Sequence, residues 1–140
     1  MKNMLDMDYT PRPESIEFFM KVISKHRSVE TVEHVELPLF QLIKPNGNEL
    51  KVLLVYVYIL SESEFLEIYS CYQDIDAIVN SSNWTRYTTG AKQLAKEHGI
   101  GLFEFKEFMG ALNHDSKRLF LNYISPEERE ENKKNNNTAF

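Results

Sequence analysis

The sequence predicts an α/β protein in which a mixed central sheet is flanked by helices. In the first half, three successive strand-like segments are separated by short turns, which indicates an antiparallel meander. In the second half, strand and helix patterns alternate as β-α-β-α-β, which indicates parallel strands joined by crossover helices. At 140 residues the chain suits one domain with one core. We place that domain at residues 11–124, between a flexible leader at 1–10 and a disordered polar tail at 125–140.

The first half contains one predicted helix and three predicted strands. Pro11 and Pro13 prepare a helix start, and apolar residues then recur at intervals of three and four as far as Ile23, so we expect a helix ending near Arg27. Val and Glu largely alternate from Val29 to Glu36, as in a half-exposed strand. The other two strands are expected at 39–43 and 50–60, joined by a turn at Asn46-Gly47.

The second half begins with a recognisable helix start. Ser61 and Glu64 have the spacing of a capping box, in which each side chain bonds the backbone of the other residue. Gly99 stands where a left-handed helix end belongs, and Asp115 is expected to cap a last short helix. The predicted elements are a helix at 61–73, a strand at 76–82, a helix at 85–98, a strand at 100–105, a helical segment to 112 and a terminal helix to 124.

Composition limits the classes of function. The net charge is −5 and the isoelectric point is near 5.4, which disfavours a protein that binds nucleic acid or an anionic membrane over its whole surface. The single cysteine, Cys71, excludes an internal disulfide and suits a reducing cytosol. The longest apolar run, Val52–Leu60, is about half of what a membrane span needs. We therefore expect a cytoplasmic protein without a membrane partner.

Residues 76–105 carry a family resemblance. A strand ends in Ser81 and Ser82, Thr85 follows, an A-K-x-x-A helix comes next, and a Gly-Ile-Gly-Leu segment returns to the sheet. The helix residues are Ala91, Lys92 and Ala95, and the returning segment contains Ile100 and Leu102. This arrangement resembles the Mrr-type branch of the restriction-endonuclease-like proteins, with a PD-(D/E)xK core, over about residues 13–112. The resemblance implies a nuclease-like α/β fold and, in active members, Mg²⁺-dependent cleavage of DNA.

The catalytic motif of that family is degenerate here. The family needs an acidic residue on the second strand and an acid-x-Lys pair within the third, where the carboxylates hold Mg²⁺ and the lysine acts on the attacking water. The matching positions are 55–58 on the third strand, with Phe40 and Gln41 on the second, and none of them carries a carboxylate or an amine. We therefore expect no catalytic residues and no cofactor.

Glu49-Leu50-Lys51 offers an alternative acid-x-Lys triplet at the start of the third strand. Its acidic partner would be Glu36, or Glu33 before it, and the protein would then be an active Mg²⁺-dependent DNA endonuclease. However, nine apolar-rich residues follow Lys51, and they would form an exposed loop if the triplet occupied the usual place. The favoured interpretation is therefore that Glu49 and Lys51 are solvated charges beside the turn.

A small basic cluster gives a second alternative, a weak DNA-binding module without catalysis. Lys92 and Lys96 are four residues apart on one helix, and a phosphate could bind between them and the preceding loop. A solvated helix face on an acidic protein is the competing interpretation. The candidate phosphate contacts are Ser82, Asn83, Thr85, Arg86, Lys92 and Lys96.

The favoured hypothesis is a protein-binding or regulatory subunit in a DNA-processing, phage or defence complex. No Lys or Arg occurs between Val52 and Thr85, whereas acidic residues are frequent there, and a protein partner suits such a surface better than DNA does. A homo-oligomer is an alternative. The candidate partner surface comprises the acidic helix and aromatic residues nearby: Glu62, Glu64, Glu67, Trp84, Phe103 and Phe108.

Overall fold

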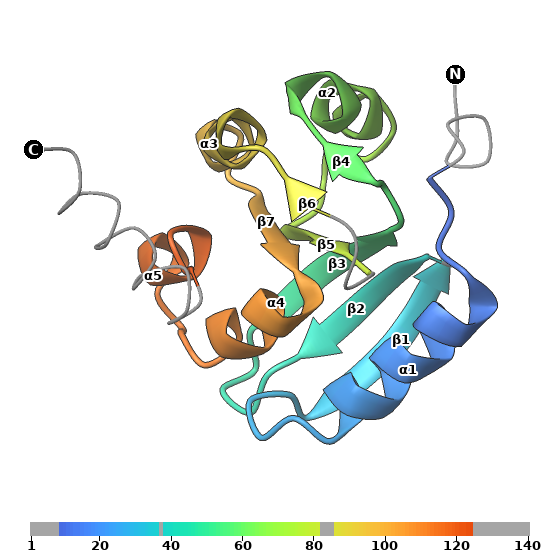
Figure 1. The fold of residues 1–140 in the computed structure, drawn as a ribbon. Helices are drawn as coiled ribbons and strands as arrows, with labels where there is room; N and C mark the ends of the chain where they lie inside the picture. The colour runs from blue at the N-terminus through green and yellow to red at the C-terminus, as the bar shows by residue number, and fades with distance from the viewer. Residues whose placement is uncertain (1–8, 37, 82–85, 125–140) are drawn as a thin grey trace, which may run out of the picture.

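The structure is a computed structural model that describes residues 9–36, 38–81 and 86–124 (Figure 1). Its centre is a five-stranded mixed sheet with the strand order β1-β2-β3-β5-β7. The first three strands are antiparallel neighbours, and β3, β5 and β7 are parallel. The predicted α/β class with a mixed central sheet is therefore confirmed. The strands are β1 (Thr31–Glu36), β2 (Leu39–Ile43), β3 (Glu49–Val55), β5 (Ala77–Asn80) and β7 (Gly101–Glu104).

Helices cover both faces of the sheet, giving three layers (Figure 1). On one face α2 (Glu62–Cys71) and α3 (Thr89–Glu97) bury an aliphatic core against β3, β5 and β7. On the other face α1 (Pro13–Ser24), α4 (Phe105–Ala111) and α5 (Lys117–Leu121) enclose a core that is rich in phenylalanine. Alternate residues of each central strand enter opposite cores, as the pleat of a strand requires.

The helix ends and tight turns follow the expected local chemistry in most places. The capping box is present, with the backbone N–H and the hydroxyl of Ser61 both donating to Glu64. Gly47 and Gly99 have φ angles of 91° and 74°, the left-handed conformation that glycine adopts at little cost. The prediction for α5 is corrected: Ser116 is its N-cap and accepts from Leu119 N–H, whereas Asp115 forms an ion pair with Lys44.

The expected long strand at 50–60 is interrupted. β3 ends at Val55, and β4 (Ile59–Leu60) pairs instead with β6 (Arg86–Tyr87) in a separate parallel two-stranded sheet. The side chain of Asn80 explains the break, because it accepts from Val57 N–H at 3.0 Å and donates to Val57 O at 2.8 Å. A side-chain amide thus takes the place of the neighbouring strand.

The helix predicted at 85–98 begins later than expected, at Thr89, because Arg86 and Tyr87 form β6 and Thr88 is the N-cap.

The start of the domain also differs from expectation. Tyr9, assigned to the leader, belongs to the folded unit: its carbonyl accepts from Tyr56 N–H at 2.9 Å, and its hydroxyl donates to Glu67. Residues 1–8 and the tail at 125–140 lie outside the described residues. Within the described ranges no helix has the length and apolar character needed to cross a membrane.

Candidate functional site

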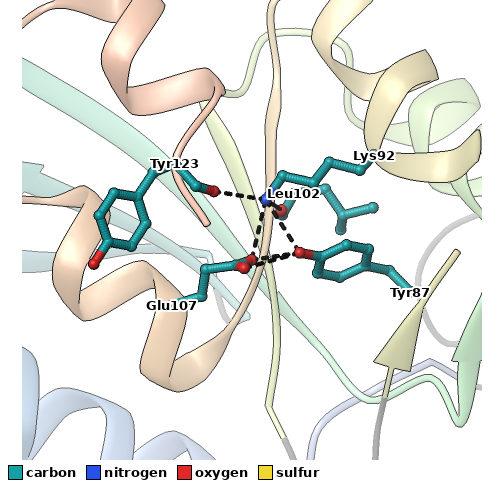
Figure 2. A network of polar contacts seen from close by, with 5 residues as sticks. All are labelled: Tyr87, Lys92, Leu102, Glu107 and Tyr123. Atoms are coloured by element: carbon teal, nitrogen blue, oxygen red, sulfur yellow. Dashed lines mark hydrogen bonds and ion pairs between the residues drawn. The ribbon is translucent and has the colours of Figure 1, made fainter. Parts of the chain in front are cut away.

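A buried ion pair joins α3 to α4 beside the edge of the sheet (Figure 2). The ammonium of Lys92 lies 3.1 Å from a carboxylate oxygen of Glu107, and the two side chains are only 7% and 2% exposed. Lys92 reaches this place because it follows Ala91 on the inward face of α3. Glu107 precedes the buried Phe108 in the first turn of α4, where the helix N-terminus favours a carboxylate. The pair is therefore fixed by the packing of two helices.

Lys92 also satisfies two backbone carbonyls. Its ammonium donates to Leu102 O at 3.0 Å and to Tyr123 O at 2.9 Å. Gly101 N–H bonds Asp76 O next to β5, so the carbonyl of the following residue, Leu102, faces away from β5 toward the free edge of the sheet. A buried carbonyl without a donor would be costly. Lys92 therefore closes part of the open edge of β7 and ties the segment after α5 to it.

Tyr87 on β6 completes the network (Figure 2). Its hydroxyl donates its one hydrogen to the carboxylate of Glu107, whose two oxygens lie 2.7 and 2.9 Å away, and it accepts from Lys92 at 3.2 Å. The ammonium of Lys92 also lies over the rings of Tyr87 and Phe103, 4.9 and 4.7 Å from their centroids. The charges of Lys92 and Glu107 are thus compensated by one another and by neutral dipoles, as burial of charge requires.

Glu104 is the partly exposed acidic neighbour of this network. Burial raises the pKa of its carboxyl group, the negative charge of Glu107 raises it further, and Arg86 and Lys92 oppose the shift. Glu104 ends β7 at the level of Asn80 on β5, so it lies at the carboxyl edge of the parallel strands. Ligands commonly bind at this edge in open α/β sheets. Glu104 is partly exposed to solvent, whereas Glu107 is enclosed.

The described members of the predicted phosphate site, Arg86, Lys92 and Lys96, differ in their exposure to solvent. Lys92 was expected on a helix surface and is instead 5% exposed, so it is not available to a phosphate in solution. Arg86 is exposed on β6, and Lys96 is half-buried in the last turn of α3. Ser82, Asn83 and Thr85 lie outside the described residues.

The alternative triplet at the start of β3 makes local polar pairs. Glu49 accepts from Gln41 at 2.9 Å, and the ammonium of Lys51 lies 3.2 Å from the carboxylate of Asp74. Through the strand register Glu36 is level with Leu53, four residues along β3 from Glu49, which corresponds to about 13 Å. The structure therefore separates Glu36 from the triplet. Glu33, the other acidic partner considered, is level with Lys51 but two strands away from it, with Gln41 between them. Within residues 9–36, 38–81 and 86–124, no three His, Cys, Asp or Glu side chains converge to hold a metal ion.

The residues of the predicted partner surface do not form one surface, because some of them are buried and others face solvent. Phe103 and Phe108 are completely buried in the phenylalanine-rich core, which corrects their assignment to a surface: strand alternation and helix periodicity point both rings inward. Trp84 lies outside the described residues. Glu62 and Glu67 remain on the solvent side of α2, with weak contacts to Thr88 and Tyr9 at 3.3 and 3.4 Å.

The solvent side of α2 forms a shallow acidic hollow, which we call the α2 hollow. Leu66 is 49% exposed there, although it is a large apolar residue. Glu64 lies at the helix start, and its hydrogen bond with the Ser61 hydroxyl lowers the pKa of its carboxyl group, so Glu64 stays negative at neutral pH. The hollow is lined by residues one helical turn apart and their neighbours: Ser61, Glu62, Ser63, Leu66, Glu67 and Ser70.

Two members of the buried network, Tyr87 and Glu107, were not among the predicted site residues. One signal in the sequence pointed to a buried role for Lys92, because it lies between Ala91 and Ala95 on the inward stripe of a helix. A lysine there needs a buried acceptor. Which acidic residue supplies it depends on how α4 packs against β7, and no local spacing encodes that packing.

The fold and site define a mixed α/β protein with a helix-covered central sheet and a buried Lys–Glu–Tyr network at one sheet edge. Comparisons with protein-family models, with curated proteins and with solved structures gave no match.

Proposed function

We propose that this protein is a catalytically degenerate restriction-endonuclease-like domain that binds a protein partner through the α2 hollow. The family assignment rests on the resemblance of residues 76–105 and on the helix–three-strand–helix order of the first half. Lys92, the lysine of the A-K-x-x-A segment, is buried in an ion pair with Glu107. Glu49 and Lys51 of the acid-x-Lys triplet pair with other surface side chains, away from Glu36.

The observation that carries the binding role is the composition of the α2 hollow. An exposed leucine lies among serines and carboxylates on one face of a helix whose other face is buried in the core. Protein interfaces usually have an apolar centre with a polar or charged rim, and the charges of the rim determine which partners bind. A basic segment of a partner, with an apolar residue to cover Leu66, complements this surface.

The resemblance suggests the setting in which such a domain acts. We propose a regulatory subunit in a DNA-processing, phage or defence complex. The wider surface is acidic overall, which favours a protein over DNA as the direct partner.

A co-purification experiment with matched variants tests the proposal. The protein is expressed with a tag in its native cell, and bound proteins are quantified by mass spectrometry for the wild type, for the double variant Glu62→Lys/Leu66→Ser, and for a control, Glu14→Lys on the opposite face. The proposal expects one or more basic proteins that are retained by the control and lost by the double variant. An identical set of bound proteins for all three forms contradicts it.

An activity assay addresses the alternative of an active nuclease. Purified protein is incubated with plasmid and branched DNA in the presence of Mg²⁺ or Mn²⁺. Cleavage that disappears in Lys51→Ala would overturn the assignment of a degenerate site. The non-catalytic DNA-binding alternative now rests on Arg86 and Lys96, since Lys92 is buried, and it predicts salt-sensitive binding that is lost when both are replaced by alanine.

A further inference from the structure

A second hollow lies at the opposite end of the sheet from Glu104 and contains a buried lysine. Its volume is about 190 Å³, and it is partly enclosed. Lys44 follows β2 and is 4% exposed; its ammonium lies 2.7 Å from Asp115 and 3.3 Å from His114 O. Three segments far apart in the sequence meet here, and they contribute the lining residues Arg27, Ser28, Lys44, Pro45, Asn46, Asn113 and Asp115.

Internal hydrogen bonds occupy the side-chain amide oxygens of this hollow. Asn113 Oδ1 accepts from the Ser28 hydroxyl at 3.0 Å and from Arg27 Nε at 3.5 Å. Asn46 Oδ1 accepts from the backbone N–H of Asn48 at 2.9 Å. Because Arg Nε–H and a backbone N–H can only donate, they fix the orientation of both amides. The NH₂ groups of Asn46 and Asn113 therefore remain as donors.

The charged groups add further donors. Lys44 has three N–H bonds, and the two contacts above account for two of them. The guanidinium of Arg27 donates through Nε to Asn113 and keeps its two terminal NH₂ groups for other acceptors. The formal charge of the lining is +1, since Arg27 and Lys44 face the single carboxylate of Asp115. The hollow is thus rich in donors and net positive on a protein whose total charge is −5.

We propose that this hollow binds a small oxyanion, the phosphate or carboxylate group of a small molecule. Such a group accepts several hydrogen bonds at once, which matches the donors that Arg27, Lys44, Asn46 and Asn113 contribute to the lining. Fixed amide donors and a guanidinium recognise the shape of an oxyanion, and the buried ammonium of Lys44 adds a charge that solvent screens little. The site shares no residue with the α2 hollow, so it stands independently of the proposed partner.

Binding is tested by titration of the ¹⁵N-labelled protein, followed by NMR, with inorganic phosphate, with a nucleoside 5′-monophosphate and with citrate. We expect saturable shifts centred on residues 27–28, 44–46 and 113–115 for at least one of these anions. Equal affinity for phosphate and the nucleotide indicates recognition of the oxyanion alone, whereas tighter nucleotide binding indicates that the hollow also holds the attached group. Tightest binding of citrate indicates a carboxylate ligand.

The decisive variant is Asn113→Asp. It keeps the oxygen that accepts from Ser28 and Arg27, so the fold is preserved, but it replaces the NH₂ donor with a second carboxylate oxygen. We expect affinity to fall about tenfold or more, because a donor is lost and a like charge is added. Gln93→Glu, an exposed position on α3, is the control with the same charge change and should retain the wild-type affinity.

A third variant, Arg27→Gln, keeps the test independent of any change at Asn113. Arg27 is exposed, so its replacement leaves the core intact, and it should also weaken binding. The inference is overturned if none of the three anions binds saturably, if the shifts centre elsewhere on the protein, or if Asn113→Asp and Arg27→Gln both bind as tightly as Gln93→Glu.

Discussion

Lys92 on α3 and Glu107 on α4 are 3.1 Å apart, although these helices lie on opposite faces of the central sheet. The two side chains meet beyond the edge strand β7, where Lys92 also binds the outward carbonyl of Leu102. The ion pair therefore joins the two outer layers of the protein around the side of the sheet. A network in this position stabilises the packing of α3, α4 and the segment after α5 together.

Replacing Lys92 with methionine should destabilise the protein strongly. Methionine fills much of the same volume but leaves the carboxylate of Glu107 buried without its cation, and two backbone carbonyls lose a donor. Breaking one side of a buried ion pair typically costs about 3–5 kcal/mol. We expect a loss of that size in the free energy of unfolding, measured by urea denaturation at pH 7.

The matched control for this change is Lys96→Met, one helical turn further along α3 and more exposed. It should alter the free energy of unfolding by less than about 0.5 kcal/mol. Adding Glu107→Gln to Lys92→Met should recover part of the loss, because the unpaired charge is then removed. If Lys92→Met unfolds at the same urea concentration as Lys96→Met, the ion pair contributes nothing to stability.

Much of the fold could be predicted because local patterns encode it. The capping box at Ser61 and Glu64 and the left-handed glycines at Gly47 and Gly99 each follow from the chemistry of a few neighbouring residues. The meander and the parallel β-α-β-α-β half follow from periodicity and from the lengths of the connections. Elements of this kind need no knowledge of distant contacts.

The remaining features depend on contacts between distant residues. The strand expected through Leu60 ends early because the side chain of Asn80, 23 residues from Val57, occupies that residue's backbone groups. Lys92 was expected on a helix surface because Lys96 follows it four residues later on the same helix. It is buried instead, because its ammonium pairs with Glu107, 15 residues further along the chain. Asp115 has the residue type of a helix cap, but its carboxylate pairs with Lys44 across the fold. These outcomes are set by packing.

Tyr87→Phe isolates the contribution of one hydroxyl. The ring and its packing remain, while Glu107 loses a donor at 2.7 Å and Lys92 loses an acceptor. Loss of a hydrogen bond to a buried charged group should reduce the free energy of unfolding by about 1.5–3 kcal/mol. Tyr58→Phe, at a tyrosine that is 71% exposed, is the comparison and should be close to neutral. Equal urea midpoints for the two variants would show that the hydroxyl of Tyr87 is dispensable.

Gly110→Ala tests how closely the segment after α5 packs on α4. A methyl group at this position would overlap the phenol ring of Tyr123, whose carbonyl accepts from Lys92. Overpacking of this kind typically costs about 1–3 kcal/mol. At Gly90 on α3 an added methyl group meets only the end of the flexible Glu62 side chain, so Gly90→Ala should be neutral or slightly stabilising. Thermal unfolding of the two variants measures this contrast, and a Gly110→Ala protein as stable as Gly90→Ala would contradict it.

Glu104→Gln should make the protein more stable at neutral pH. Burial and the nearby Glu107 raise the pKa of Glu104 in the folded state above its ordinary value of 4.5, so the folded protein binds the proton more tightly than the unfolded chain does. Stability is therefore highest below that ordinary value and falls as the pH rises through the raised folded-state pKa, above which the full penalty remains. Glutamine has no charge and removes the penalty.

The gain from Glu104→Gln should consequently be largest at pH 7 and should shrink toward zero as the pH falls below the ordinary value of 4.5, where the wild-type carboxyl becomes protonated in both states. Urea denaturation of the wild type and the variant across this range measures the difference. Glu97→Gln, an exposed position on α3, serves as the control for loss of one negative charge. A Glu104→Gln protein that is less stable than the wild type at pH 7 would mean that attraction to Arg86 and Lys92 outweighs burial and repulsion from Glu107, and that the direction of the pKa shift is the reverse.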